Sequence, residues 1–129
     1  MNTYRKTVQV REGDLDALEH VNNIRYLEWV QDISKEHWDQ LSNPEWDKRY
    51  LWVVRSHSIT YHQPALLGQI LRLTTFVPES RGPISRRKVD MVLEDTGKKI
   101  AECLTEWVLL EAASGRPTRI PEEVRIVFE

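Results

Sequence analysis

Residues 13–29 read GDLDALEHVNNIRYLEW, and this stretch passes from a polar loop into a helix. Asn22 and Asn23 stand directly before the first apolar residue of a helical pattern, where asparagine is favoured as an N-cap. The apolar residues that then recur at helical spacing are Ile24, Leu27, Val30, Ile33, Trp38 and Leu41. Asn43-Pro44 ends the pattern. The sequence therefore predicts a single long helix over residues 24–41, with a length of about 27 Å.

The remaining chain has the alternation and the β-branched and aromatic content of strands. Strands are expected over residues 4–10, 50–62, 69–78, 84–94 and 98–111. The turn Asp95-Thr96-Gly97 joins the last two, and a polar loop over residues 12–22 precedes the helix. Residues 112–129 form a proline-containing tail that adds at most a short edge segment.

The last predicted strand is apolar on both faces. One face carries Ala101, Cys103 and Leu109, and the other carries Leu104 and Val108 among acidic residues. A strand with two apolar faces is normally buried on both, and a single helix covers only one face of a sheet. We therefore expect an α+β fold in which a curved antiparallel sheet wraps a long central helix. A second subunit would shield the other face, in a homodimer or a homotetramer.

Composition limits the classes of protein to consider. A length of 129 residues corresponds to one domain, expected over 1–129. The net charge of −2 argues against nucleic-acid and membrane-surface binding, which need a basic excess. The single cysteine, Cys103, and the lack of a signal-peptide pattern favour a cytoplasmic protein. No HExxH or CxxC spacing is present, so no metal site and no cofactor are expected.

The stretch Asp14-Leu15-Asp16 followed by His20-Val21-Asn22-Asn23 resembles the helix-entry motif of hot-dog thioesterases of the 4-hydroxybenzoyl-CoA thioesterase type. It is most similar to the motif of the long-chain acyl-CoA and plant acyl-ACP thioesterases. Residues 59–69, ITYHQPALLGQ, resemble the end of the family's second strand, and Gly115-Arg116-Pro117 resembles its tail. The resemblance covers nearly the whole chain in the right order. It implies a hot-dog fold and hydrolysis of a fatty acyl thioester carried by coenzyme A or acyl carrier protein.

Two positions depart from the family pattern. Many relatives have glycine where this chain has Glu19, although the long-chain and plant types carry glutamine there. The plant enzymes have asparagine at the position of Leu18, so a catalytic role for that asparagine does not transfer to this chain.

The resemblance assigns a catalytic site to the loop and the start of the helix. Asp16 is expected to act as general base on water or as direct nucleophile. The N–H of Asn23, at the positive end of the helix, is expected to stabilise the oxyanion. His20 would orient the acyl group or assist proton transfer. From composition alone, an aspartate before a helix is usually a cap or a dipole partner, and Asp14 is expected to have that structural role.

Further residues are expected to bind the substrate. Val21, Asn22 and Tyr26 lie within the matched motif, beside the expected reaction centre. Arg86-Arg87-Lys88 is a basic run that is either a solvated strand end or a contact for the phosphates of the carrier.

Three other functions remain open from the sequence. They are an acyl-CoA dehydratase or hydratase of the same fold, a non-catalytic acyl-CoA-binding protein, and an oligomeric structural protein. The helix-entry motif favours hydrolysis over the first, and Asp16 with His20 argues against the last.

Overall fold

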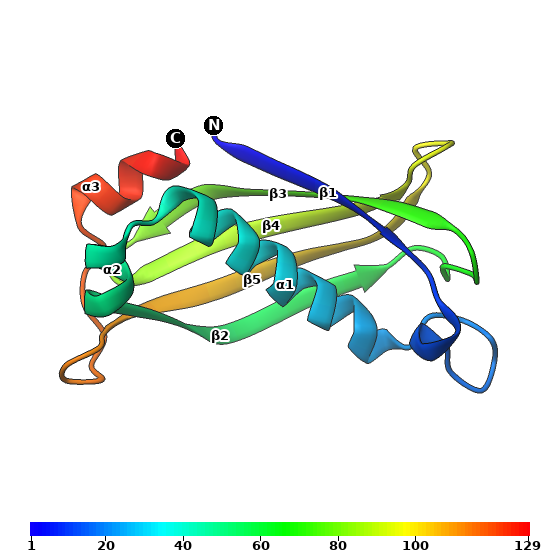
Figure 1. Ribbon diagram of the computed structural model, residues 1–129, viewed down its shortest axis with the longest axis horizontal. Coiled ribbons are helices and arrows are strands. Elements are labelled where there is room, and N and C mark those ends of the chain that lie inside the picture. Colours follow the sequence, from blue (N-terminus) through cyan, green and yellow to red (C-terminus); the bar gives the residue numbers. More distant parts are fainter.

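The computed structural model describes all residues 1–129. Its elements are β1 (Thr3–Gln9), η1 (Glu12–Asp14), α1 (Asn23–Leu41), α2 (Pro44–Arg49), β2 (Tyr50–Tyr61), β3 (Ile70–Arg81), β4 (Ile84–Leu93), β5 (Lys99–Glu111), α3 (Glu122–Arg125) and η2 (Ile126–Phe128). The five strands form one antiparallel sheet in the order β1-β3-β4-β5-β2. Figure 1 shows α1 lying across one face of this sheet. The predicted α+β architecture is confirmed.

Helix α1 begins where its N-cap is. The side chain of Asn22 accepts a hydrogen bond from the N–H of Ile24 at 3.0 Å, so Asn22 is the cap. The face of α1 turned to the sheet consists of Tyr26, Trp29, Val30, Ile33, Ser34 and His37. Its apolar members pack on fully buried side chains of the three central strands, among them Leu73, Met91 and Ile100. This contact makes the core and holds the start of α1 in a fixed position over the sheet.

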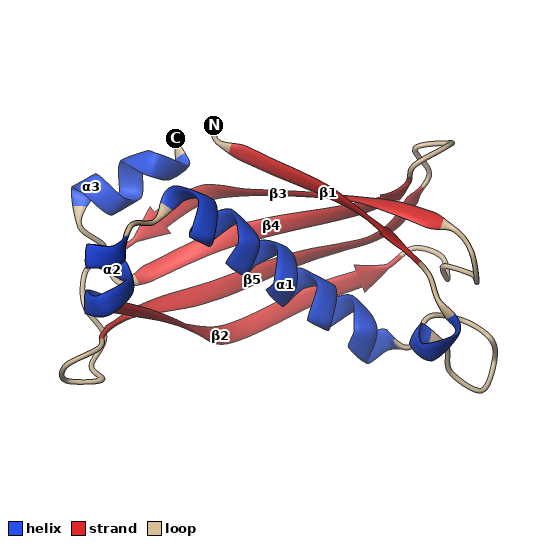
Figure 2. Cartoon of the chain, in the orientation of Figure 1, coloured by secondary structure: helices blue, strands red, loops and turns tan.

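Two helical segments were not predicted. Helix α2 follows directly after α1, with Asn43 as its N-cap and Pro44 in its first turn. It buries Trp46, which stacks on Trp38 at 5.8 Å between ring centroids. The tail turns into α3 and η2 instead of an edge strand, and only an isolated bridge joins Leu110 to Pro117. Figure 2 shows both segments at the C-terminal end of α1, far from the loop that precedes this helix.

The face of the sheet away from α1 is only partly covered. Leu104, Val108 and Leu110 of β5 are half-buried, whereas Cys103 and Leu109 on the helix side are buried. β2 is an edge strand of the sheet and its backbone pairs on one side only. None of the helices is long and apolar enough to cross a membrane.

Candidate functional site

The loop before α1 is a closed turn held by its own backbone. Leu15 and Val21 form an antiparallel bridge, and the N–H of Asp16 donates to the carbonyl of His20 at 2.8 Å. Glu19 lies at the tip with a φ of 62°, in the left-handed region that favours glycine. Glu19 adopts this backbone conformation at some cost in strain.

Asp16 presents its carboxylate at the surface of this loop. Its Oδ1 accepts hydrogen bonds from the backbone N–H groups of Leu18 at 2.9 Å and His20 at 3.2 Å. Oδ2 makes no hydrogen bond within the chain, and the residue is exposed. The side chain is therefore held in one orientation while one oxygen stays free to accept a proton from a bound molecule.

Asp14 has a different environment. Its Oδ1 forms an ion pair with Nε of Arg25 at 2.9 Å, and its Oδ2 accepts from the N–H of Arg11 at 2.8 Å. The carbonyl of Asp14 accepts from the N–H of Asn22 at 2.8 Å. Both carboxylate oxygens of Asp14 are thus engaged in joining the loop to the first turn of α1. These contacts match the structural role expected for this residue.

The first turn of α1 supplies a free backbone donor. Asn22 accepts from Ile24 through its side chain and from Arg25 through its carbonyl, at 3.0 and 2.8 Å. The N–H of Asn23 donates neither of these two bonds. The hydroxyl of Tyr61, at the end of β2, donates to the carbonyl of Asn23 at 3.4 Å. The helix start therefore lies next to the end of β2, with the N–H of Asn23 at the positive end of the helix dipole.

The second sequence match packs directly against the first. The N–H of Val21 donates to the carbonyl of Ala65 at 3.1 Å, and the N–H of Ala65 donates to the hydroxyl of Tyr26 at 3.0 Å. His20 pairs with Leu66 in an isolated bridge. Burial raises the pKa of Tyr26, so its hydroxyl stays neutral at physiological pH. Residues 59–69 thus form the wall that fixes the Asp16 loop against α1.

The predicted site residues differ in exposure. His20 is half-buried and its ring makes no hydrogen bond, while Asn22 and Asn23 are exposed. Val21 and Tyr26 are 2% exposed and belong to the main core cluster. Tyr61 was not predicted as a site residue. The Tyr-x-x-Pro-Ala pattern of residues 61–65, interpreted only as the end of a strand, was the one signal in the sequence that pointed to it.

The basic run on β4 does not form one surface. Arg86 and Lys88 lie on the sheet face away from α1, where Arg86 is paired with Glu79 and Glu106. Lys88 lies 3.8 Å from Glu102 on the same face. Arg87 points to the opposite face, is 4% exposed, and donates to Nδ1 of His37 at 2.8 Å.

The other ionisable groups of the sheet do not gather into a metal site. Nδ1 of His57 lies 2.7 Å from the hydroxyl of Thr105 on the helix side, and burial lowers the pKa of His57. His62 pairs with Glu102 at 2.8 Å, and the pKa of Glu102 is lowered to about 2, mainly by its hydrogen bonds to Lys99 and His62. Cys103 is buried, as expected for a core thiol. No group of three or more histidine, cysteine or acidic side chains is arranged to hold a metal ion.

Comparison with known proteins places this geometry in a family. Residues 10–128 match the Thioesterase-like superfamily. The chain is 28% identical over 127 residues to the long-chain acyl-CoA thioesterase FadM of Escherichia coli, covering 95% of this chain and 94% of the relative.

Two solved structures extend the match to the fold. The probable thioesterase YbaW of Escherichia coli superposes with a TM-score of 0.83 at 27% identity, covering 95% of this chain and 94% of the other. A thioesterase of Thermus thermophilus in complex with coenzyme A and zinc gives a TM-score of 0.84 at 27% identity, covering 96% of this chain and 90% of the other. The chain therefore belongs to the thioesterase-like superfamily, and the hot-dog fold and thioesterase activity expected from the helix-entry motif are confirmed.

Proposed function

We propose that this protein hydrolyses a fatty acyl-CoA thioester with Asp16 as the group that activates water or attacks the carbonyl carbon. The observation that carries the proposal is the geometry of the Asp16 loop. Two backbone N–H groups fix one oxygen of the carboxylate and leave the other free. The same loop is hydrogen-bonded to the start of α1 in its own chain, which fixes the position of the carboxylate within each subunit.

In this proposal the thioester carbonyl oxygen binds at the start of α1. As water or Asp16 adds to the carbonyl carbon, negative charge develops on that oxygen. The N–H of Asn23 donates to it, and the positive end of the helix dipole favours the charge. When water adds, Asp16 takes its proton, and collapse of the tetrahedral intermediate releases the free acid and expels the thiolate of the carrier, which takes up that proton. When Asp16 itself adds, collapse expels the thiolate and leaves a mixed anhydride on Asp16, which a water molecule then hydrolyses to the free acid. The carboxylate of Asp16 and the helix start that act on the same substrate molecule are expected to come from two different subunits.

His20 and the neighbouring residues are proposed to position the acyl group. The ring of His20 is half-buried and free of hydrogen bonds, so it is available to a ligand. Val21 and Tyr26 are core residues whose part is to support the wall of the site, and the exposed side chain of Asn22 caps the helix start. Coenzyme A is favoured as carrier because the FadM relative is named an acyl-CoA thioesterase and the Thermus structure contains coenzyme A. A cytoplasmic location fits this carrier and the single buried thiol.

The outer pair of basic residues on β4 is proposed to contact the carrier phosphates. Reversing both charges, Arg86→Glu with Lys88→Glu, is expected to raise KM for acyl-CoA by roughly fivefold, since an exposed ion pair contributes up to about 1 kcal/mol. A short thioester that lacks the nucleotide should be hydrolysed as by the wild type. Lys48→Glu on α2, an exposed lysine on another element, is the control. An equal loss on both substrates would point to misfolding instead of a phosphate contact.

The protein is proposed to be a homodimer or homotetramer. β2 is a 12-residue edge strand with an unpaired side, and its side chains Leu51 and Val53 are 50% and 41% exposed. Long exposed edge strands are normally covered by another chain. Light scattering at micromolar concentration should give at least twice the chain mass of 15.2 kDa. A particle of about 15 kDa would contradict the proposal.

A further inference from the structure

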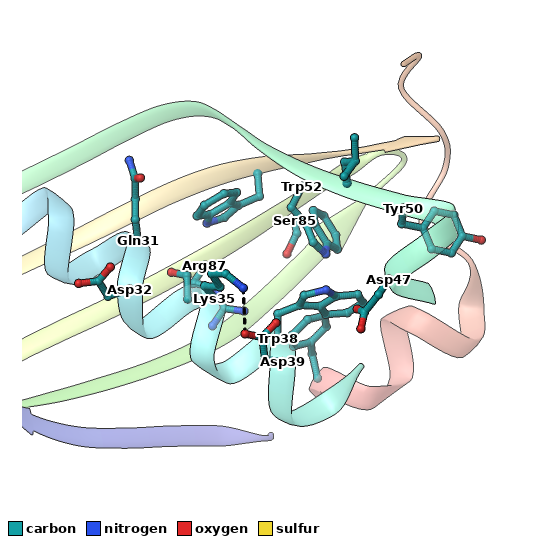
Figure 3. Close-up of a pocket in the computed structure, with 14 residues that line it drawn as sticks. Gln31, Asp32, Lys35, Trp38, Asp39, Asp47, Tyr50, Trp52, Ser85 and Arg87 are labelled. Carbon is teal, nitrogen blue, oxygen red and sulfur yellow. Dashed lines mark hydrogen bonds and ion pairs between the residues drawn. The ribbon is translucent and has the colours of Figure 1, made fainter. Parts of the chain in front are cut away.

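A cavity lies at the other end of α1 from the Asp16 loop. It has a volume of about 550 Å³, within the range typical of small-molecule sites. Among the residues that line it are Trp38, Trp52, Trp107, Phe128, Ser85 and Arg87 (Figure 3). Trp38 lies fifteen residues beyond Asn23 on the same helix, or about 22 Å along its axis. Within one chain the cavity is therefore separate from the site proposed for hydrolysis.

Arg87 brings a buried positive charge to this cavity. Nη1 donates to Nδ1 of His37 at 2.8 Å and to the hydroxyl of Thr75 at 3.0 Å, and the guanidinium lies 5.6 Å from the ring centroid of Phe128. All of these partners are uncharged side chains. Arg87 has no carboxylate within ion-pair distance, and its Nε and Nη2 make no hydrogen bond in the chain. Burial lowers its pKa to about 10, which leaves it charged at neutral pH.

His37 does not compensate for this charge. Its Nδ1 accepts from Arg87, and its Nε2 lies 2.7 Å from Oδ1 of Asn2, which accepts the remaining ring proton. Burial, and then the charge of Arg87, lower the pKa of His37 to about 4, so the ring is neutral. A buried charge without a counter-ion is costly, because the interior solvates it poorly. The charge of Arg87 is thus available to an anion that enters the cavity.

The other polar side chains that line the cavity include two tryptophans and three aspartates. The indole N–H groups of Trp52 and Trp107 are buried without a hydrogen-bond partner. The carboxylates that line the cavity, Asp32, Asp39 and Asp47, belong to exposed residues at its mouth. Asp39 is paired with Lys35, and solvent screens exposed charges far more than buried ones. The interior is therefore cationic and aromatic, while its mouth is acidic.

We propose that this cavity binds the carboxylate of an amphiphilic organic acid, with Arg87 as the counter-ion and the tryptophan rings around the hydrocarbon part. The guanidinium forms charge-assisted hydrogen bonds with a carboxylate through its unused N–H groups. The aromatic walls accept a flat or alkyl body. This inference does not depend on thioester hydrolysis, because binding is measured without turnover.

Two sources present the same chemistry. One is a free monocarboxylic acid, such as the product of a thioesterase. The other is the far carboxylate of an acyl thioester whose chain carries an acid group at its end. Both place one carboxylate and an apolar chain in the cavity, and the experiment below separates them.

The test is titration with decanoate and with decan-1-ol, followed by tryptophan fluorescence and calorimetry. Three tryptophans line the cavity, so occupation changes their emission. Decanoate is expected to bind the wild type at least tenfold more tightly than the alcohol, and Arg87→Met should abolish this preference. Arg86→Met, one residue away on the opposite face, should keep it. Equal affinity of the folded wild type for acid and alcohol would overturn the proposal.

Two additions complete the test. Trp107→Ala removes one aromatic wall of the cavity, and it gives a second variant should Arg87→Met fail to fold; decanoate is expected to bind it several-fold more weakly than the wild type. Unchanged binding in every folded cavity variant would show that decanoate binds elsewhere. Hydrolysis of octadecanoyl-CoA and its end-carboxylated analogue, whose chains are long enough to reach from the start of α1 to the cavity, identifies the source. A higher kcat/KM for the analogue than for the plain acyl-CoA, lost in Arg87→Met, would show that the cavity holds the far end of the substrate. Equal kcat/KM values for the two would show that the cavity holds the free acid.

Discussion

Asp16→Asn is expected to lower kcat by roughly 10²–10⁴-fold, the usual loss when a general base is removed. KM should change little, because the acyl chain and the carrier bind elsewhere. The Asn side chain retains an oxygen that accepts hydrogen bonds from the N–H groups of Leu18 and His20, so the loop keeps its shape. Stability should therefore stay close to that of the wild type. The measurement is kcat on a long-chain acyl-CoA together with the melting temperature.

Asp14→Asn is the matched control for this experiment. Asp14 pairs with Arg25 and accepts from the N–H of Arg11, so removing its charge weakens two contacts that join the loop to α1. The expected loss of stability is about 1 kcal/mol. The effect on kcat should be much smaller than that of Asp16→Asn. A near wild-type kcat for Asp16→Asn, or a larger kcat loss for Asp14→Asn, would show that the catalytic assignment is wrong.

Tyr26→Ala is expected to destabilise the protein by about 3–5 kcal/mol, the range for truncating a large buried aromatic side chain. Tyr26 is 2% exposed and packs against Trp29 and Tyr61 at centroid distances of 5.7 and 5.4 Å. Its hydroxyl also accepts from the N–H of Ala65, which links the wall of the site to α1. Urea unfolding followed by circular dichroism measures the free energy of unfolding.

Tyr26→Phe separates the hydroxyl from the ring. The ring contacts remain, but the N–H of Ala65 loses its acceptor, at a cost of about 1–3 kcal/mol. This variant should fold and keep measurable thioesterase activity. If Tyr26→Ala unfolded at the same urea concentration as the wild type, the packing described for the site would be incorrect.

Much of the fold was predictable because its signals are local. The long helix, its Asn22 cap and five strands follow from periodicity and turn residues, and the structure moves most of their ends by one to three residues. Helix α2 was missed because Asn43-Pro44 was interpreted only as a terminator, although the pair is also a good N-cap and first turn. The short α3 depends on packing Val124 at the far end of the core, which no local pattern reveals.

The site was predictable only in part. The helix-entry motif identifies Asp16 and the start of α1 as neighbours in sequence, and their hydrogen bonds are short-range. Tyr61 and Ala65 meet the first turn of α1 over separations of 38 and 39 residues, so their roles appear only in the tertiary structure. Successive side chains of a strand point to opposite faces of the sheet, so Arg87 is expected on the face opposite to Arg86 and Lys88. Treating these three residues as one basic patch ignored that period, and the structure shows the separation.

The most direct test of the account is a thioesterase assay of the purified protein with acyl-CoAs of graded chain length. Release of free coenzyme A is measured with a thiol reagent, in parallel for the wild type and Asp16→Asn. Saturable hydrolysis by the wild type is expected, with a kcat that falls by at least a hundredfold in the variant. Binding of acyl-CoA with no release of thiol from any chain length, by a correctly folded wild type, would contradict it.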